Sequence, residues 1–445
     1  MILETRKNLN AQSLYRTAKE LFLKKFPNPE RGSSKSQKKS SENKIKIPKI
    51  DCIMSCVALF SLKFLSLLQY NKQRCFPRIA HNLKTLFGVQ KAPSDTSMRE
   101  SLDTVNPQDI RGVFKPILAH LQRGKALEPY VYLEKKYLLS MDGTGHFSSP
   151  TIHCKNCCVK EHKNGTKTFH HQMLAAVIVH PDQKQVIPLA PEPILKQDGA
   201  TKNDCERSAA KRLLADIRRE HPHLPLIVVE DSLASNGPHI KELQKHNMSY
   251  ILGVKPGDHA FLLDWIKDLE MMHHEEIDSE GTKHIYSFAN EVPLNDANFD
   301  LKINFLAYWE IEKKGKEQHF SWVTDFTLTK ENVKSIMRGG RERWRIENNT
   351  FNTLKNQGYN FEHNFGHGYE NLCAIMGFLM MLAFFIDQAQ ELCCMVFKKA
   401  RKLTGRYTTL WETMRILFIS ECFENWNDLF FKIIELWTPP EKNTS

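Results

Sequence analysis

Three carboxylates are the residues of this sequence with the clearest chemical potential: Asp142, Asp231 and Glu347. Asp142 ends the apolar run 137–142 and Asp231 follows the β-branched run 226–229, so each is expected where a strand emerges. Three oxygen ligands brought together would hold Mg²⁺ or Mn²⁺. Two such ions about 3.5–4 Å apart can activate an attacking hydroxyl and stabilise the leaving oxygen at phosphorus. The trio therefore predicts metal-dependent phosphoryl transfer, although an Asp at a strand end is also commonly a turn former or a helix cap.

Glu347 is expected on a helix over 341–356, because this stretch lacks Pro and Gly and follows a break at Gly339-Gly340. At about 100° per residue, one face of that helix carries four residues: Trp344, Glu347, Phe351 and Leu354. Burying an unpaired charge is costly, and Arg343 lies one turn before Glu347 and can pair with it. Glu347 is thus either half of a structural ion pair or a metal ligand, and Trp344 is expected in the core.

A cysteine- and histidine-rich segment offers a second kind of metal site. It contains a C-x2-C pattern, and its candidate ligands are Cys154, Cys157, Cys158 and His162. Thiolates and imidazole suit tetrahedral Zn²⁺, which here would be structural and would tie the loop after the first core strand. No second C-x2-C follows, and the pair His170-His171 lacks the spacing of a zinc finger. A surface loop with free thiols is the alternative.

The charge of the chain indicates a polyanionic partner. The 445 residues carry a net charge of +11, and residues 1–50 hold 13 Lys and Arg against 4 Asp and Glu. Such an imbalance most often serves nucleic-acid binding, although a solvated basic tail has the same composition. The Ser- and Lys-rich stretch 31–46 is expected to be a flexible linker.

The hydrophobic pattern indicates a cytoplasmic protein with no membrane segment. The apolar stretches 52–70 and 372–386 are expected to be core helices, because a membrane span needs about 20 apolar residues. The first residues lack the basic and apolar regions of an export signal, so the eleven cysteines are expected to be reduced.

The order of the expected elements predicts an α/β fold. Helices are expected first, over 10–26, 50–71, 76–87 and 107–122. From about residue 130 strands alternate with helices at 204–220 and 238–247, which predicts a mixed sheet. The chain then divides into five parts: a helical, basic DNA-binding region (1–128), the first part of the core (129–256), a β-rich insertion (257–325), the rest of the core with the Glu347 helix (326–370), and a C-terminal helical region (371–445).

Three motifs carry a resemblance to a known family. They are Met141-Asp142-Gly143-Thr144, the run 229–234 (Val-Glu-Asp-Ser-Leu-Ala), and Arg343-x3-Glu347 with its continuation to Asn356. Together they resemble the insertion-sequence DDE transposases, in particular the IS-four-like family, which has a β-rich insertion before the Glu and a Y-x2-R-x3-E-x6-K signature around it. The resemblance covers roughly residues 136–370, and it implies a prokaryotic, nucleoid-associated protein. The stretch 51–102 is also similar to what precedes the core in such transposases.

The resemblance implies an RNase H-like core, a mixed sheet with helices on both faces, in which Asp142, Asp231 and Glu347 form the metal-binding triad. It also implies four basic residues near the DNA: Arg343, Lys355, Arg341 and Arg345. Gly340 occupies the position of the signature's Tyr. Lys355 comes one residue after the signature's Lys position, which on a regular helix moves the ammonium by about 100° around the axis.

The function expected on these grounds is that of a DNA transposase. It would bind double-stranded DNA at terminal inverted repeats and at the target, and catalyse Mg²⁺-dependent cleavage and strand transfer as a homodimer in a synaptic complex. Three alternatives remain open: an RNase H-like nuclease that only hydrolyses, a catalytically silent transposase-derived DNA-binding protein, and a zinc-dependent DNA-binding regulator.

Overall fold

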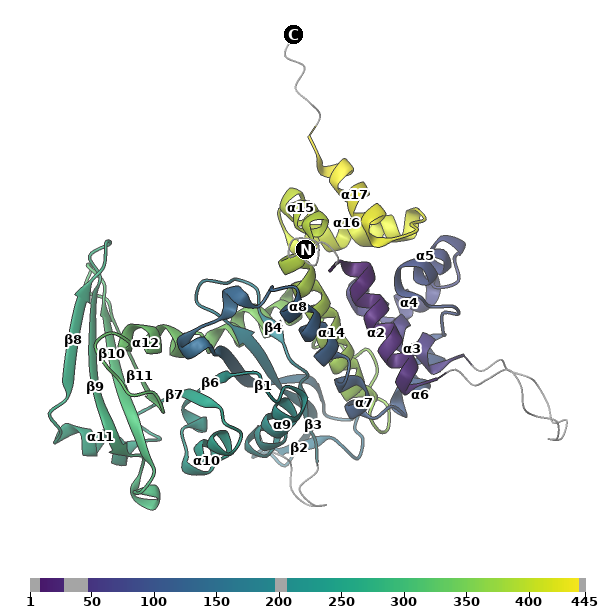
Figure 1. Ribbon diagram of the computed structural model, residues 1–445. Coiled ribbons are helices and arrows are strands. Elements are labelled where there is room, and N and C mark those ends of the chain that lie inside the picture. Colours follow the sequence, from purple (N-terminus) through teal and green to yellow (C-terminus); the bar gives the residue numbers. More distant parts are fainter. Residues whose placement is uncertain (1–8, 28–46, 197–205, 440–445) are drawn as a thin grey trace, which may run out of the picture.

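The core of the protein is a mixed β-sheet with helices packed on both faces (Figure 1). The computed structural model describes residues 9–27, 47–196 and 206–439. The predicted linker 31–46 and the first two residues of the predicted helix 204–220 lie outside these ranges.

Four strands form the centre of the sheet. β1 (Tyr137–Ser149) pairs antiparallel with β3 (Lys167–Val179) on one side and parallel with β6 (Leu226–Glu230) on the other. β7 (Ser249–Gly253) continues the parallel set beside β6. Three short strands also pair with β3: β2 (Cys158–Glu161), β4 (Ile187–Pro188) and β5 (Glu192–Ile194). This combination of parallel and antiparallel pairs is the RNase H-like mixed sheet that the resemblance implied.

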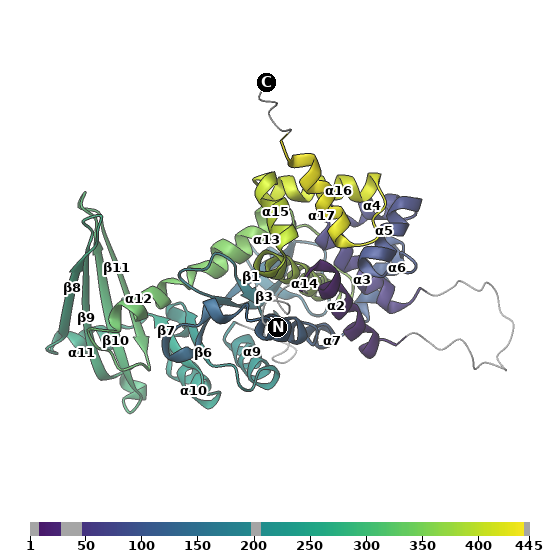
Figure 2. The ribbon, with the colours of Figure 1, turned by 45° about the horizontal axis from the view of Figure 1, so that its top comes forward.

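The β-rich insertion continues the same sheet. Its four strands are β8 (Met272–Ile277), β9 (Lys283–Pro293), β10 (Lys302–Ile311) and β11 (Glu317–Thr324). β11 pairs antiparallel with β7, and β10, β9 and β8 follow in that order. Figures 1 and 2 show this antiparallel arm extending away from the helical part of the molecule, with α11 (Ala260–Lys267) beside it.

Helices cover the two faces of the sheet (Figure 1). α9 (Glu206–Glu220) packs on β3 and β5, and α10 (Gly237–Lys245) packs on β7. On the opposite face, α12 (Val333–Arg341) packs on β6, β7 and β10, and α14 (Leu372–Cys393) packs on β3 and β4. The segment between α12 and α14 contains η5 (Ile346–Phe351), a π-helix, and α13 (Asn352–Asn356).

Gly339 and Gly340 were expected to break the chain, and this prediction is wrong, because both lie inside α12. A Cβ on Gly340 would lie 2.5 Å from Nε1 of Trp322, and one on Gly339 would lie 3.1 Å from Cδ1 of Ile251. The glycines therefore serve close helix-to-sheet packing. Their intrinsic cost in a helix is overridden by this contact with the sheet.

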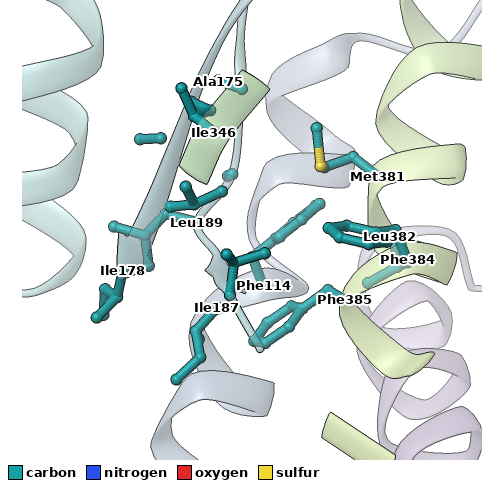
Figure 3. Close-up of a cluster of buried hydrophobic side chains, with 14 of the residues drawn as sticks. Phe114, Ala175, Ile178, Ile187, Leu189, Ile346, Met381, Leu382, Phe384 and Phe385 are labelled. Atoms are coloured by element: carbon teal, nitrogen blue, oxygen red, sulfur yellow. The ribbon is translucent and has the colours of Figure 1, made fainter. Parts of the chain in front are cut away.

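α14 is the central core helix. Figure 3 shows Phe384 and Phe385 of this helix among side chains of β3, β4 and α8 (Phe114–Arg123). The rings of Phe385 and Phe114 stack 6.0 Å apart. Within the described residues, α14 alone is long and apolar enough to cross a membrane, but 94% of its most apolar window is buried inside the protein. Its apolar surface is therefore already covered, as predicted for a core helix at 372–386.

The remaining helices precede and follow the core. Before it come α2 (Ala11–Lys25), α3 (Lys49–Ser61), α4 (Leu67–Gln73), α5 (Pro77–Phe87), α6 (Asp95–Asp103), α7 (Pro107–Arg111) and α8 (Phe114–Arg123). After it come α15 (Met395–Thr404), α16 (Tyr407–Ser420) and α17 (Trp426–Trp437). Short 3₁₀ turns lie at Glu128–Tyr130, Leu133–Lys135, Ser232–Ala234 (η3) and Asp296–Asn298.

The single helix predicted over 50–71 is two helices. Lys63 has a φ of 56°, in the left-handed region, and its ammonium donates to Asp387 of α14 at 2.7 Å. Ser66 then accepts from the backbone N–H of Gln69 at 3.1 Å, which caps the N-terminus of α4. A buried ion pair with a distant helix, invisible in local periodicity, places the break.

The helices at the two ends of the chain pack against each other. The ring of Trp426 lies 5.0 Å from that of Tyr15 and 5.2 Å from that of Phe87. Its Nε1 donates to the carbonyl of Leu86 at 3.0 Å. Figures 1 and 2 show α16 and α17 beside α2 and α5. The N- and C-terminal helices therefore share one core.

Candidate active site

Asp142 and Asp231 lie on neighbouring parallel strands. Ser140 of β1 pairs with Val229 of β6, so two residues further along each strand the chain reaches Asp142 and Asp231. Both side chains line one cleft of about 550 Å³. Asp231 also accepts the backbone N–H of Leu233 at 3.0 Å, so it caps η3 as well. The structure brings these two carboxylates together at the carboxyl end of β6, where sites assemble in α/β sheets.

Asp142 does not end its own strand, which corrects the sequence-based prediction. β1 continues to Ser149, and Asp142 pairs with Ala175 of β3. β3 pairs with β1 as far as Ser149, and these backbone hydrogen bonds keep β1 extended beyond the end of β6. Asp142 thus lies where its parallel neighbour ends.

The segment that carries Glu347 is joined to β1. Oγ of Ser140 donates to the carbonyl of Arg343 at 3.0 Å. Since residues i and i+2 of a strand share a face, Asp142 faces the same segment as Ser140. Glu347 itself lies in the π-helix η5, a geometry that is rare and is frequent at functional sites.

Arg343 lies between two of the carboxylates. Its Nη1 is 2.9 Å from Oε1 of Glu347 and 3.9 Å from Oδ2 of Asp142. Its guanidinium also stacks 4.4 Å from the ring of Trp344. The predicted core position of Trp344 is wrong, because 48% of its surface is exposed. The turn at Glu342 and the π-helix change the angular spacing, so a regular 100° count does not hold across this segment.

Negative charge accumulates around Asp142. Partial burial raises the pKa of Asp142 well above its ordinary value, and the charges of Glu347 and Glu206 raise the pKa further. The backbone N–H of Gly143 and the guanidinium of Arg343 act in the opposite direction without cancelling this effect. Asp142 therefore binds a proton more readily than an ordinary carboxyl group, because it is partly buried and has acidic neighbours.

Comparison with known proteins identifies the family. A family model described as the transposase DDE domain matches residues 140–385, which is more than half of the chain and includes all three carboxylates. The chain belongs to the DDE transposases. A search of curated proteins found no match. The family and the RNase H-like sheet agree with the resemblance of the three motifs.

The four basic residues expected near DNA all have carboxylate partners in this transposase. Arg341 pairs with Glu310 of β10, and its guanidinium stacks on Phe320. Lys355 lies 2.8 Å from Glu362. Arg343 pairs with Glu347, as described above. Arg345 pairs with Glu342 and donates to the carbonyl of Pro181 at 3.0 Å. Arg341 and Arg345 therefore also hold this segment to the sheet and to the loop after β3.

Two further acidic groups line the same cleft and were missed in the sequence. Glu206 begins the described part of α9, and a Cβ on Gly143 would lie 2.2 Å from its Oε1, so it sits over the strand beside Asp142. Glu230 lies 2.6 Å from Nε2 of His239. Burial alone would lower the pKa of His239, but the Glu230 carboxylate raises it. Its position directly before Asp231 could have indicated Glu230 as a residue of the cleft. No sequence feature pointed to Glu206.

The structure also changes the proposed zinc ligands. Four side chains, which we call the Cys–His cluster, have ligand atoms within 4.8 Å of one another: Cys154, Cys157, His171 and His367. Two predicted ligands lie elsewhere. Sγ of Cys158 lies 3.7 Å from the carbonyl of Ile194, and Nε2 of His162 lies 2.7 Å from the hydroxyl of Thr168. Cys158, the first residue of β2, thus directs its sulfur to β5 and away from the Cys–His cluster.

Proposed function

We propose that this transposase binds the terminal inverted repeats of its element and catalyses DNA cleavage and strand transfer with Asp142, Asp231 and Glu347. The observation that supports the proposal is the strand register, in which Asp142 and Asp231 each follow by two residues the pair Ser140 and Val229, together with the hydrogen bond from Ser140 to Arg343. Water would attack the phosphodiester at the element end and release a 3′-OH, which would then attack the target DNA. No covalent intermediate with the protein is needed.

The three carboxylates fit Mg²⁺ or Mn²⁺. All are hard oxygen donors, which these ions prefer. Asp142 and Asp231 line one cleft, and Glu347 is joined to Asp142 through the guanidinium of Arg343. When bound, two such ions would activate the attacking hydroxyl and stabilise the leaving oxygen. Glu206 and Glu230 line the same cleft as Asp142 and Asp231. We propose that their negative charges add to the electrostatic potential that attracts the ions.

Arg343 has two tasks in this proposal. Its contact with Glu347 orients that carboxylate toward Asp142. The remaining guanidinium donors suit a DNA phosphate, since Arg presents five donors in a planar fork. The ring of Trp344 stacks on the guanidinium and restrains its orientation. About half of the Trp344 surface is exposed and could contact DNA.

Lys355 is compatible with the role of the signature's Lys despite its shift by one residue. A π-helical turn takes up one residue more than an α-helical turn, because its bonds run from i to i+5. The π-helix Ile346–Phe351 lies between Glu347 and Lys355 and can absorb the extra residue. Leu354, in the regular position, is fully buried. We propose that Lys355 exchanges its Glu362 partner for DNA phosphate.

The charge distribution supports DNA as the partner. The excess of Lys and Arg in residues 1–50 favours a DNA-binding role for the region 1–128, and joining two element ends requires two copies in a synaptic complex. Binding that neutralises phosphates weakens steeply with salt. Arg341 and Arg345 are proposed to contact the backbone of DNA that approaches the Glu347 segment.

A strand-transfer assay separates this function from its nearest alternative. Labelled duplexes ending in the inverted repeats that flank the coding sequence are incubated with the protein, Mg²⁺ and a target plasmid. Joined product supports the proposal. Cleavage without joining would identify a nuclease that only hydrolyses, and binding without cleavage would identify a silent transposase.

A further inference from the structure

The Cys–His cluster joins three segments that are far apart in the sequence. Cys154 and Cys157 lie in the loop after β1, His171 lies in β3, and His367 lies in the loop that leads into α14. Cys157, His171 and His367 are buried, and Cys154 is partly buried. Two thiols and two imidazoles converging in the interior need a common partner.

The distances within the cluster match a tetrahedral zinc site. Zinc bonds of about 2.3 Å to sulfur and about 2.0–2.1 Å to nitrogen put two sulfurs about 3.8 Å apart and sulfur and nitrogen about 3.5 Å apart. The sulfurs of Cys154 and Cys157 are 3.9 Å apart. Nε2 of His171 lies 3.5 Å from the first sulfur and 3.3 Å from the second. Nε2 of His367 lies 3.2 Å from Cys157 Sγ.

The tautomer of His367 also supports a zinc site. Its Nδ1 lies 2.9 Å from the carbonyl of Gly368, which can only accept, so Nδ1 carries the proton. In the neutral ring Nε2 then presents a lone pair toward the sulfurs. A backbone carbonyl on the other ring nitrogen is the usual support of a metal-binding histidine. The ring of Phe147, 4.5 Å away, adds an apolar wall.

We propose that the Cys–His cluster binds one structural zinc ion. Two thiolates and two imidazoles are the ligand set of closed, tetrahedral zinc sites, and four protein ligands leave no open position for chemistry. The ion would fasten the loop after β1 and the strand β3 to the segment between Glu347 and α14.

A second contact holds the same loop from the other side. The carboxylate of Asp103, at the end of α6, accepts four consecutive backbone N–H groups, from Tyr369, Glu370, Asn371 and Leu372. The loop is thus fixed to the N-terminal helices through Asp103 and would be fixed to the sheet through zinc. Zinc would therefore set how the catalytic sheet and the helical part of the molecule are held together.

The test is the metal content of the full chain, purified without chelator or affinity metal. We expect about one zinc per chain in the wild type and its loss in Cys157→Ser and His367→Ala. The matched controls are Cys158→Ser and His162→Ala, which change the neighbouring thiol and a nearby imidazole and should retain zinc. Wild-type protein without zinc, or equal loss of zinc in the two control variants, would overturn the proposal.

Cobalt covers the case in which a ligand variant fails to fold. Replacing zinc by Co²⁺ in the wild-type protein should give the visible absorption of a tetrahedral site and a sulfur-to-cobalt charge-transfer band of two thiolates. An octahedral spectrum without the charge-transfer band would contradict the ligand set. Both readouts are independent of DNA cleavage, so they stand whether or not the proposed transposition activity is found.

Discussion

Nη1 of Arg343 lies 2.9 Å from Oε1 of Glu347, one helical turn away, and the same nitrogen reaches within 3.9 Å of Asp142. One guanidinium therefore links the π-helical segment to the central strand of the sheet. It ties together two members of the proposed triad that are more than 200 residues apart in the chain.

Replacing Arg343 by Ala should lower the rate of DNA cleavage by about 10²-fold, because a preorganised donor at a phosphoryl-transfer site is lost. Measuring cleavage at saturating Mg²⁺ and at saturating DNA separates this effect from weaker binding. Arg338→Ala is the control, since that guanidinium pairs with the exposed Asp182. Equal losses in the two variants would argue for a general charge effect.

Replacing Gly340 by Ala should destabilise the fold by about 1–3 kcal/mol through overpacking, because the added Cβ would lie 2.5 Å from Trp322. Urea denaturation followed by Trp fluorescence measures the free energy of unfolding. Gly112→Ala is the matched control, since nothing lies within 4 Å of its Cβ position and its φ of −58° suits any residue. If both variants unfold at the same urea concentration, the packing argument fails.

Lys63→Met should cost about 3–5 kcal/mol of stability, because it leaves the carboxylate of Asp387 buried without its cation. The double variant Lys63→Met/Asp387→Leu removes both charges and should recover part of the loss. Lys72→Met, at an exposed position of α4, should change little. A double variant less stable than Lys63→Met alone would show that the pair is not the source of the cost.

The link through Asp103 predicts a specific pH dependence. Burial alone would raise the pKa of Asp103, but the four backbone N–H groups at the start of α14 lower it. A folded-state pKa below the unfolded one gives stability that is fully present above the ordinary value of 3.8 and is lost as pH falls through the folded value.

Asp103→Asn should therefore be less stable than the wild type at neutral pH, and the difference should shrink below about pH 4. Thermal unfolding from pH 3 to pH 7 measures it. Glu100→Gln, exposed on the same helix, should show no such convergence. A difference that stays constant down to pH 3 would mean that the charge of Asp103 is not what the loop requires.

The sequence was informative where local pattern decides the structure. The helix at 76–87, the strands of the insertion and the approach of Asp142 to Asp231 all follow from periodicity and from the order of strands. The catalytic role of the three carboxylates and the zinc role of the C-x2-C pair stay predictions, drawn from residue types and contexts.

What the sequence could not show depends on contacts between distant segments. The glycines of α12 looked like a helix break in the sequence. Their role is to let Trp322 and Ile251 approach the helix backbone, and these residues come from distant strands. His367 lies more than 200 residues from Cys157, so no spacing rule could select it over His162. Glu206 joined the site only because α9 packs beside β1.

The central claim is that Asp142, Asp231 and Glu347 act together on DNA phosphate. The most direct measurement compares cleavage and end binding for Asp231→Asn, with Asp264→Asn at an exposed position of α11 as the control. The account predicts that Asp231→Asn binds inverted-repeat DNA as tightly as the wild type and gives no detectable cleavage with Mg²⁺ or Mn²⁺. Cleavage by Asp231→Asn at the wild-type rate would contradict it.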